Sequence, residues 1–172
     1  MKIYGYENSS ISEEKYLYKA LGIDLKEKNI ISFVGGGGKT TSVYTLAREL
    51  SNLGKKVLVT TTTHMHMPND CIDFKGDVKE ITERLKIHNL VTVGIKEKND
   101  KISSVGEDIA ILLSSEKGQK KGVHECKNAI YRALINKVDN KELLDLAEEI
   151  CEYLQQNNIK SIITSYKEFN EV

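Results

Sequence analysis

A short run of glycines followed by lysine and threonine is the clearest chemical feature of this sequence. The run consists of Gly35, Gly36, Gly37, Gly38, Lys39, Thr40 and Thr41. Glycines let backbone N–H groups approach phosphate oxygens closely, and the start of a following helix adds a partial positive charge. Lys39 can reach the terminal phosphates, and Thr40 can ligate Mg²⁺. We therefore predict a phosphate-binding loop in which Lys39 and Thr40 are the catalytic candidates and Thr40 is the metal ligand.

The loop is shorter than the usual Walker pattern. In G-x-x-x-x-G-K-[ST] the first glycine would fall on Phe33, so the sequence carries G-x-x-G-K-T-T instead. The alternative is a glycine-rich turn that only allows close packing, with Lys39 in solvent. We favour the phosphate loop because consecutive glycines cost folding entropy and need a compensating role.

A second polar motif follows a later apolar segment and consists of Asn136, Lys137, Val138 and Asp139. An aspartate can accept two hydrogen bonds from the amide and amine edge of guanine, and a lysine stem can lie along the ring. This order predicts binding of GTP, with Asn136 holding the loop. The alternative is that Asp139 or Asn140 only caps the last helix, in which case ATP becomes the alternative nucleotide.

Threonines also follow the segment Lys56-Val57-Leu58-Val59, at the edge where open α/β sheets bind ligands. The hydroxyls of Thr61 and Thr62 are candidates to contact Mg²⁺, water or a γ-phosphate. The alternative is that they are β-branched residues that end a strand. His64 and His66 with Cys71 have weak metal-ligand spacing, so we predict no soft-metal site there.

The elements that position these residues alternate between strand and helix. We predict strands at 30–34, 56–60, 90–95, 129–135 and 161–164, and helices at 43–53, 78–85, 109–113 and 143–154. This alternation predicts a three-layer α/β fold of the P-loop NTPase type, with a mostly parallel sheet covered by helices on both faces. The capping-box spacing of Ser10 and Glu13 predicts a helix inside an N-terminal helical extension, residues 1–28.

Size and composition predict one cytoplasmic domain over residues 1–172. The chain has 25 Lys and Arg against 25 Asp and Glu, so net charge does not favour nucleic acid or an anionic membrane as a partner. Its three cysteines include no Cys-x-x-Cys pair. No apolar run is long enough to span a bilayer, and the start has no signal-peptide stretch. The oligomeric state is left open.

The glycine loop, the later string from Val57 to His64, and the blocks at 115–122 and 134–139 together resemble the YqeC-type accessory proteins of selenium-dependent molybdenum hydroxylases. The resemblance implies an accessory factor in maturation of a molybdenum enzyme, whose partner would be that hydroxylase or a maturation protein. The short loop is also similar to that of Mur-type peptide ligases, which use ATP. The alternatives are an ATP-dependent enzyme of ligase or kinase type and a non-catalytic nucleotide-sensing module.

One departure from that family bears on catalysis. Family members carry a strand that ends in an acidic residue between the third strand and the block at 115–122, whereas residues 95–125 are shortened here. No predicted apolar strand ends in an acid that could act as the Walker B ligand, and Asp73 is a poor substitute. We therefore expect Mg²⁺ and nucleotide binding, with NTPase activity slow if present.

Overall fold

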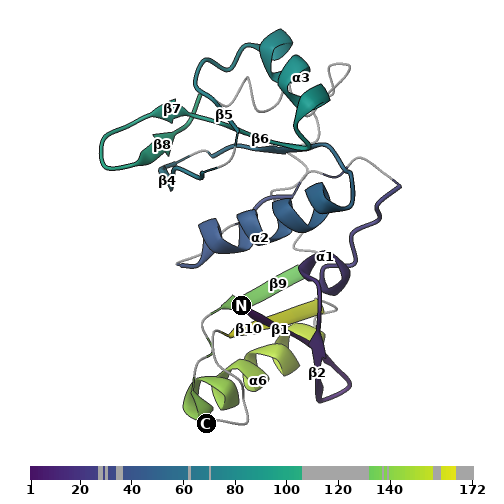
Figure 1. The fold of residues 1–172 in the computed structure, drawn as a ribbon. Coiled ribbons are helices and arrows are strands. Elements are labelled where there is room, and N and C mark those ends of the chain that lie inside the picture. The colour runs from purple at the N-terminus through teal and green to yellow at the C-terminus, as the bar shows by residue number, and fades with distance from the viewer. Residues whose placement is uncertain are drawn as a thin grey trace. The chain divides into compact units, whose positions relative to one another are not determined.

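The computed structural model describes residues 1–26, 29, 31–33, 37–61, 63–69, 71–105, 132–136, 138, 140–156 and 160–165. The chain divides into two compact units (Figure 1). The first contains residues 1–31, 35–38 and 126–172, and the second contains residues 32–34 and 39–125. Each unit is described separately below.

The first unit is built on a mixed four-stranded sheet in the order β2-β1-β10-β9. Its strands are β1 (Lys2–Glu7), β2 (Ser10–Glu14), β9 (Arg132–Asn136) and β10 (Lys160–Ser165). β9 and β10 are parallel, while β1 is antiparallel to both β2 and β10. The strands predicted at 129–135 and 161–164 therefore form in their described parts, and residues 129–131 lie outside the described chain.

The N-terminal helix prediction is wrong at its start. Ser10 and Glu13 lie in β2, and a hairpin turn at Asn8 and Ser9, with φ of 51° and 56°, joins β1 to β2. Asparagine tolerates this left-handed backbone better than most residues, so the turn is compatible with the sequence. The helical part is only α1 (Leu17–Ala20), whose Leu17 is fully buried.

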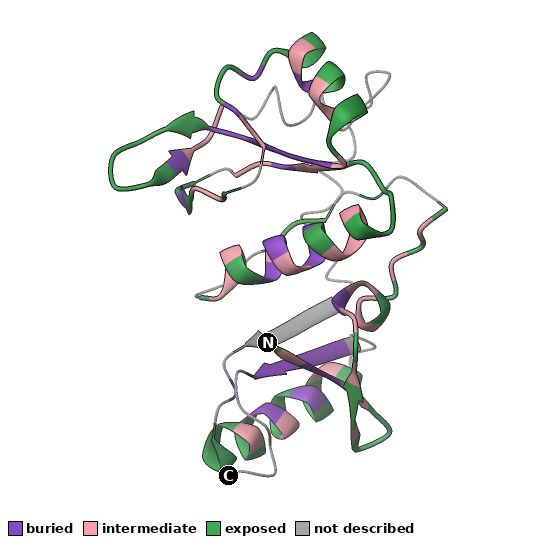
Figure 2. Ribbon diagram, in the orientation of Figure 1, coloured by how far each residue is buried: buried purple, intermediate pink, exposed green. Residues whose placement is uncertain are grey.

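Helix α6 (Lys141–Gln156) connects the two parallel strands β9 and β10. Ala147 and Cys151 of this helix pack with Tyr4, Val138 and Ile163 in the core of the unit. Figure 2 shows that its buried side faces the sheet and that its other side is exposed. The helix predicted at 143–154 is confirmed.

The second unit contains a parallel three-stranded sheet in the order β3-β6-β5. Its strands are β3 (Val57–Val59), β6 (Leu90–Val93) and β5 (Ile72–Asp73). Thr92 of β6 lies between Val59 and Ile72, and Asp73 is level with Val93. All three strands point the same way, so their carboxyl ends share one edge of the sheet.

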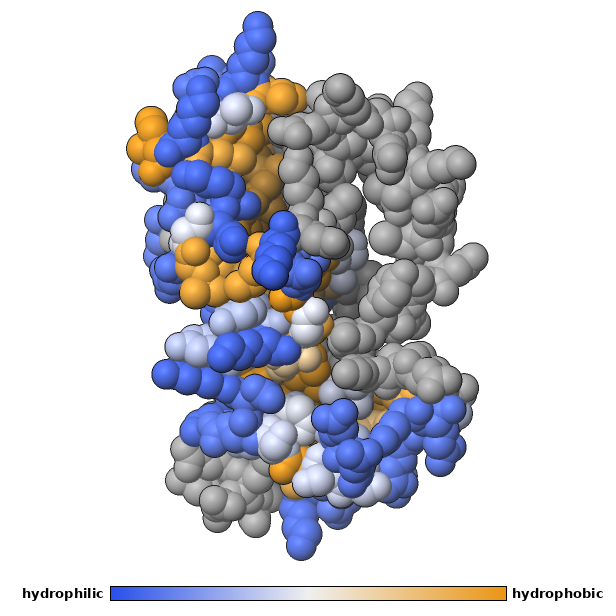
Figure 3. All heavy atoms as spheres, turned by 90° about the vertical axis from the view of Figure 1, so that its right-hand side faces the viewer, coloured by the Kyte–Doolittle hydropathy of each residue, from blue (hydrophilic) through white to orange (hydrophobic). Residues whose placement is uncertain are grey.

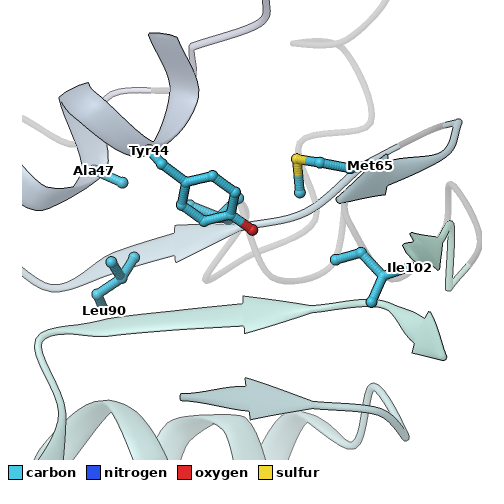
Figure 4. Packing of buried hydrophobic residues seen from close by; sticks show 6 residues of the cluster. Tyr44, Ala47, Met65, Leu90 and Ile102 are labelled. Atoms are coloured by element: carbon cyan, nitrogen blue, oxygen red, sulfur yellow. The ribbon is translucent and has the colours of Figure 1, made fainter. Parts of the chain in front are cut away.

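Two helices cover opposite faces of this sheet because side chains alternate along β6. Leu90 packs with Tyr44 and Ala47 of α2 (Lys39–Asn52) (Figure 4). Val91 and Val93 pack with Ile81 of α3 (Val78–Ile87). The helices predicted at 43–53 and 78–85 are confirmed, each starting somewhat earlier or ending somewhat later than its apolar pattern indicates.

A small antiparallel sheet completes the second unit. Its order is β4-β8-β7, with β4 (Met65–His66), β7 (Ile95–Lys96) and β8 (Lys101–Ser103). Ile102 of β8 is fully buried and joins Met65 in the core beneath α2. Figure 3 shows orange, hydrophobic atoms at the surface of the molecule. The exposed large apolar residues of this unit include Phe74, Val78, Ile87 and Ile95.

The α/β class is confirmed, but the mostly parallel sheet is not what the described strands form. One sheet is parallel, one is mixed and one is antiparallel. Ile31, Ser32 and Phe33 carry no strand, so the strand predicted at 30–34 is absent from its described residues. The helix predicted at 109–113 lies outside the described residues.

Candidate phosphate site

The predicted phosphate loop leads directly into α2. Gly38 has φ of +66°, a left-handed conformation that favours glycine, and the helix begins at the next residue, Lys39. Thr40 and Thr41 therefore lie in the first turn, where backbone N–H groups have no helical partner. Of the glycines, Gly37 and Gly38 are described, and Gly35 and Gly36 lie outside the described residues.

The first turn of α2 contains no acidic residue. The other two long helices each carry one there, namely Glu80 in α3 and Glu142 in α6. In α3 the carboxylate of Asp77 also accepts a hydrogen bond of 2.9 Å from the N–H of Glu80. The positive end of the α2 dipole is therefore not offset by a carboxylate of its own first turn, which favours an external anion.

The direction of α2 relative to β3 follows from the short turn between them, and it decides where the first residues of α2 lie. Gly54, with φ of +76°, ends the helix, and the N–H of Lys55 donates to the carbonyl of Leu50. β3 begins at Val57 and packs under α2. A helix that returns onto the next strand through so short a turn runs antiparallel to it. Lys39 and Thr40 therefore lie toward the carboxyl ends of the strands.

Among the described residues of this unit, two hydroxyls are shielded from solvent without a hydrogen-bond partner. They are Ser42 Oγ, on the second turn of α2, and Thr60 Oγ1, on the residue that follows β3. An unpaired buried hydroxyl costs about 1–3 kcal/mol, so each exception calls for an explanation. A ligand group or an ordered water would satisfy them. Sequence reasoning missed Ser42, which lies outside the pattern that marks a phosphate loop, and from the threonine run that begins at Thr60 it chose Thr61 and Thr62.

The two threonines predicted to contact ligand have different outcomes. Thr61 is described, and its Oγ1 accepts a hydrogen bond of 3.2 Å from the N–H of Thr63. Thr62 lies outside the described residues. The buried Thr92 shares a 3.4 Å hydrogen bond with the hydroxyl of Tyr44, which ties β6 to α2 behind the loop. Tyr44 is labelled in Figure 4.

A strand does end in an acid, contrary to the sequence prediction. β5 ends at Asp73, whose side chain is 1% exposed. Its Oδ1 accepts the N–H groups of Lys75 at 3.0 Å and Gly76 at 2.7 Å, and its Oδ2 lies 3.3 Å from Arg84 Nε. Both oxygens therefore hold the loop and helix that follow β5. A hydrogen bond to Glu80 is the main cause that raises the pKa of Arg84, so the guanidinium stays charged.

Asp73 is also displaced from Thr60 across the sheet. Asp73 is level with Val93, and Thr60 follows Val59, which pairs with Thr92. The two residues therefore stand on opposite sides of β6, about 9.5 Å apart at two strand spacings. The side chain of Asp73 faces α3 through Arg84. This carboxylate is placed to fix the β5–α3 loop.

The predicted guanine motif belongs to the first unit. Asn136 is the last residue of β9, while Lys137 and Asp139 lie outside the described residues. Val138 is buried, and its N–H donates to the carbonyl of Thr164 at 3.1 Å. Asn140 Oδ1 accepts from the N–H of Leu143 at 2.8 Å, so Asn140 caps α6.

The described residues contain neither a group of side chains suited to a metal ion nor a membrane-spanning helix. In that part of the chain, no group of three or more His, Cys, Asp and Glu side chains is placed to hold a metal ion. Within the same residues, no helix has the length and hydrophobicity needed to cross a membrane.

Comparison with known proteins identifies relatives. A family model described as YqeC protein matches residues 31–164. The uncharacterized protein YqeC of Escherichia coli (strain K12) is 54% identical over 52 residues, which are 28% of this chain and 20% of that protein. The chain thus spans about a fifth of the length of this relative. No solved structure shows significant similarity to the chain.

Proposed function

The chain belongs to the YqeC protein family, and we propose that it binds a magnesium nucleotide at the start of α2. The preferred nucleotide in this proposal is GTP. The observation that carries the proposal is the junction of Gly38, in left-handed conformation, with a helix whose first turn holds Lys39 and Thr40 and no acid. That junction combines the N-terminal end of a helix, its dipole and a lysine, which together suit a phosphate chain.

Buried polar groups nearby in the same unit support a ligand at this edge. Ser42 Oγ and Thr60 Oγ1 have no partner, although both are shielded from solvent. In the proposed complex Lys39 neutralises the terminal phosphates, and Thr40 supplies a hydroxyl to Mg²⁺. Magnesium would offset phosphate charge and orient the chain.

The guanine preference rests on the order of Asn136, Lys137 and Asp139 after β9. The capping alternative is met for Asn140, which caps α6 through the Leu143 N–H. The proposal therefore rests on Asp139, the neighbouring residue of the motif, as the one that reads the base. ATP remains the competing nucleotide, in line with the similarity of the short loop to Mur-type ligases.

The cellular role follows from the resemblance alone. An accessory factor in maturation of a selenium-dependent molybdenum hydroxylase would act on that enzyme or on a maturation protein. Nucleotide binding without rapid turnover fits such a role as well as it fits a sensing module. The partner protein is part of this proposal.

The decisive experiment is titration of the protein with fluorescent GTP and ATP analogues, with and without Mg²⁺. Lys39→Ala should weaken binding at least about tenfold, because a charge-assisted contact is worth about 1.5–3 kcal/mol. Lys79→Ala is the matched control, since Lys79 is an exposed residue in the first turn of α3 in the same unit. If Lys39→Ala bound nucleotide with wild-type affinity, the proposed phosphate site would be wrong. If GTP and ATP analogues bound with equal affinity, the proposed guanine preference would be wrong.

A further inference from the structure

Helix α6 exposes a row of large apolar side chains that the core of its unit does not use. Buried Ala147 and Cys151, with the partly buried Leu144, form the packed row against the sheet. The exposed row follows the spacing i, i+3, i+7 and i+10, and its members with their exposed fractions are Leu143 at 40%, Leu146 at 51%, Ile150 at 39% and Tyr153 at 66%. This is the a/d spacing of a helix–helix seam.

The two rows are neighbours on the helix surface. At about 100° per residue, their centres are about 100° apart, so the apolar arc of α6 covers about half of its circumference. A helix that packs only on a sheet needs a narrower apolar stripe. The packed row, which contacts the sheet, occupies one half of this arc. The exposed row occupies the other half, which is wide enough to be covered by a second helix lying beside α6.

Carboxylates border the exposed row on the side away from the sheet. A shallow depression there is lined by Glu142, Leu143, Asp145, Leu146 and Glu149. Lys141 is the single basic residue of the helix. A second copy of α6 would place like charges against this border, whereas a basic helix would complement it.

We propose that the exposed row of α6 is the docking surface for an amphipathic helix of another protein that carries lysine or arginine beside its apolar seam. Apolar residues of that helix would pack between Leu143, Leu146 and Ile150. Its basic residues would pair with Glu142, Asp145 and Glu149. This interaction surface uses no residue of the phosphate site or of the motif proposed to read the base.

The test uses the full chain and a designed helical peptide about three heptads long, with leucine at the a and d positions and lysine at e and g. Fluorescence anisotropy should show saturable binding of this peptide, and a peptide with glutamate in place of each lysine should not bind. Leu146→Ser combined with Ile150→Ser should weaken binding at least about tenfold. Ile87→Ser is the control, since Ile87 is 79% exposed on α3, and it should bind like wild type.

Three results would overturn the proposal. The first is no binding of the basic peptide to wild type, and the second is equal binding to wild type and to the double variant. The third is a wild-type dimer in sedimentation velocity that the double variant abolishes, since the row would then hold a second copy. Circular dichroism melting of the double variant should match wild type, because both replaced side chains are partly in solvent.

Discussion

Arg84 Nε lies 3.3 Å from Asp73 Oδ2, so the carboxylate that ends β5 forms an ion pair with the helix that follows it. The guanidinium also donates to Glu80 Oε1 at 2.7 Å and contacts Cys71 Sγ at 3.8 Å. Asp73 therefore links β5 to α3, and its position at a strand end does not make it a free ligand for Mg²⁺.

Asp73→Asn should destabilise the protein by about 1.5–3 kcal/mol, the usual worth of a hydrogen bond to a charged group. The loss of stability is not larger because Arg84 is 38% exposed, so solvent still screens its charge after the substitution. Urea unfolding measures the loss. Magnesium-dependent nucleotide binding should change less than about twofold while the protein is folded.

Asp77→Asn is the matched control for this prediction. Asp77 caps α3 from an exposed position, and asparagine caps equally well, so stability should fall by less than about 0.5 kcal/mol. If Asp73→Asn kept wild-type stability and abolished the effect of Mg²⁺ on binding, Asp73 would be a metal ligand and the assignment made here would be wrong.

The three long helices of the described residues were predictable because apolar side chains recur at helical spacing over eight residues or more in each. The strands β4, β5 and β7 have only two residues each, too few for alternation to show. The strand that ends at Asp73 was missed for this reason, since Ile72 and Asp73 form a strand only by pairing with β6. Ser10 was predicted to begin a helix but lies in a strand, because pairing of β2 with β1 outweighs a local capping pattern. Asn8 was the available hairpin signal.

The start of the helix α2 was predictable from the sequence, but the buried hydroxyls of its unit were not. Glycine, lysine and threonine spacing located the start of α2, because that chemistry is local in sequence. Ser42 and Thr60 were not predictable, since whether a hydroxyl is paired depends on packing between α2 and its surroundings. Thr61 was chosen from the sequence, but its hydroxyl accepts a bond from the Thr63 backbone.

Gly94 should tolerate no side chain. A Cβ there would lie 2.9 Å from both Cβ and Cδ1 of Ile102 and 3.1 Å from the carbonyl oxygen of Ser103. Ile102 is fully buried between α2 and the sheet, so it has little room to move. Gly94→Ala should therefore cost about 1–3 kcal/mol in urea unfolding, as overpacking does.

Gly5→Ala provides the comparison for Gly94. Its Cβ would meet no atom closer than 3.6 Å, which is an ordinary contact. We expect a change within about 0.5 kcal/mol. Equal effects of the two substitutions would show that Ile102 yields to an added methyl group, contrary to the close packing inferred for this core.

Asp139→Asn should weaken GTP binding and favour xanthosine triphosphate. The asparagine amide can donate to the carbonyl that xanthine has in place of the guanine amine, whereas an aspartate cannot. Competition titrations with GTP, xanthosine triphosphate and ATP measure the change. Asn140→Ala is the control, because it removes the cap of α6 and should lower stability by about 1 kcal/mol without altering base preference.

The base preference separates the two interpretations of this motif. If Asp139→Asn lowers stability as Asn140→Ala does and leaves the three affinities in their wild-type order, Asp139 contributes to the helix start and not to base recognition. The proposal for GTP would then give way to ATP.

Nucleotide hydrolysis by the isolated chain should be very slow. Phosphoryl transfer needs magnesium held by the loop threonine, and usually by a carboxylate, together with a group that orients the attacking water. Thr40 lies in the first turn of α2, but Asp73 is held by Arg84 and by the N–H groups of Lys75 and Gly76. β3 is followed by threonines and β6 by Gly94, so neither of these strands supplies an acid.

We therefore expect Mg²⁺ to strengthen nucleotide binding through Thr40 and the phosphates, while phosphate release stays at or below about 10⁻⁴ per second, the scale of unassisted switch GTPases. Thr40→Ala should remove the magnesium effect on affinity, and Thr82→Ala, which changes a threonine of α3 that bonds only its own helix, should not. Phosphate release at several per second without a partner would show that another group activates water. Asp73 and Asp108 would then be the first residues to replace, because a fast rate that survives Asp73→Asn but not Asp108→Asn would place the missing acid in the shortened region at 95–125.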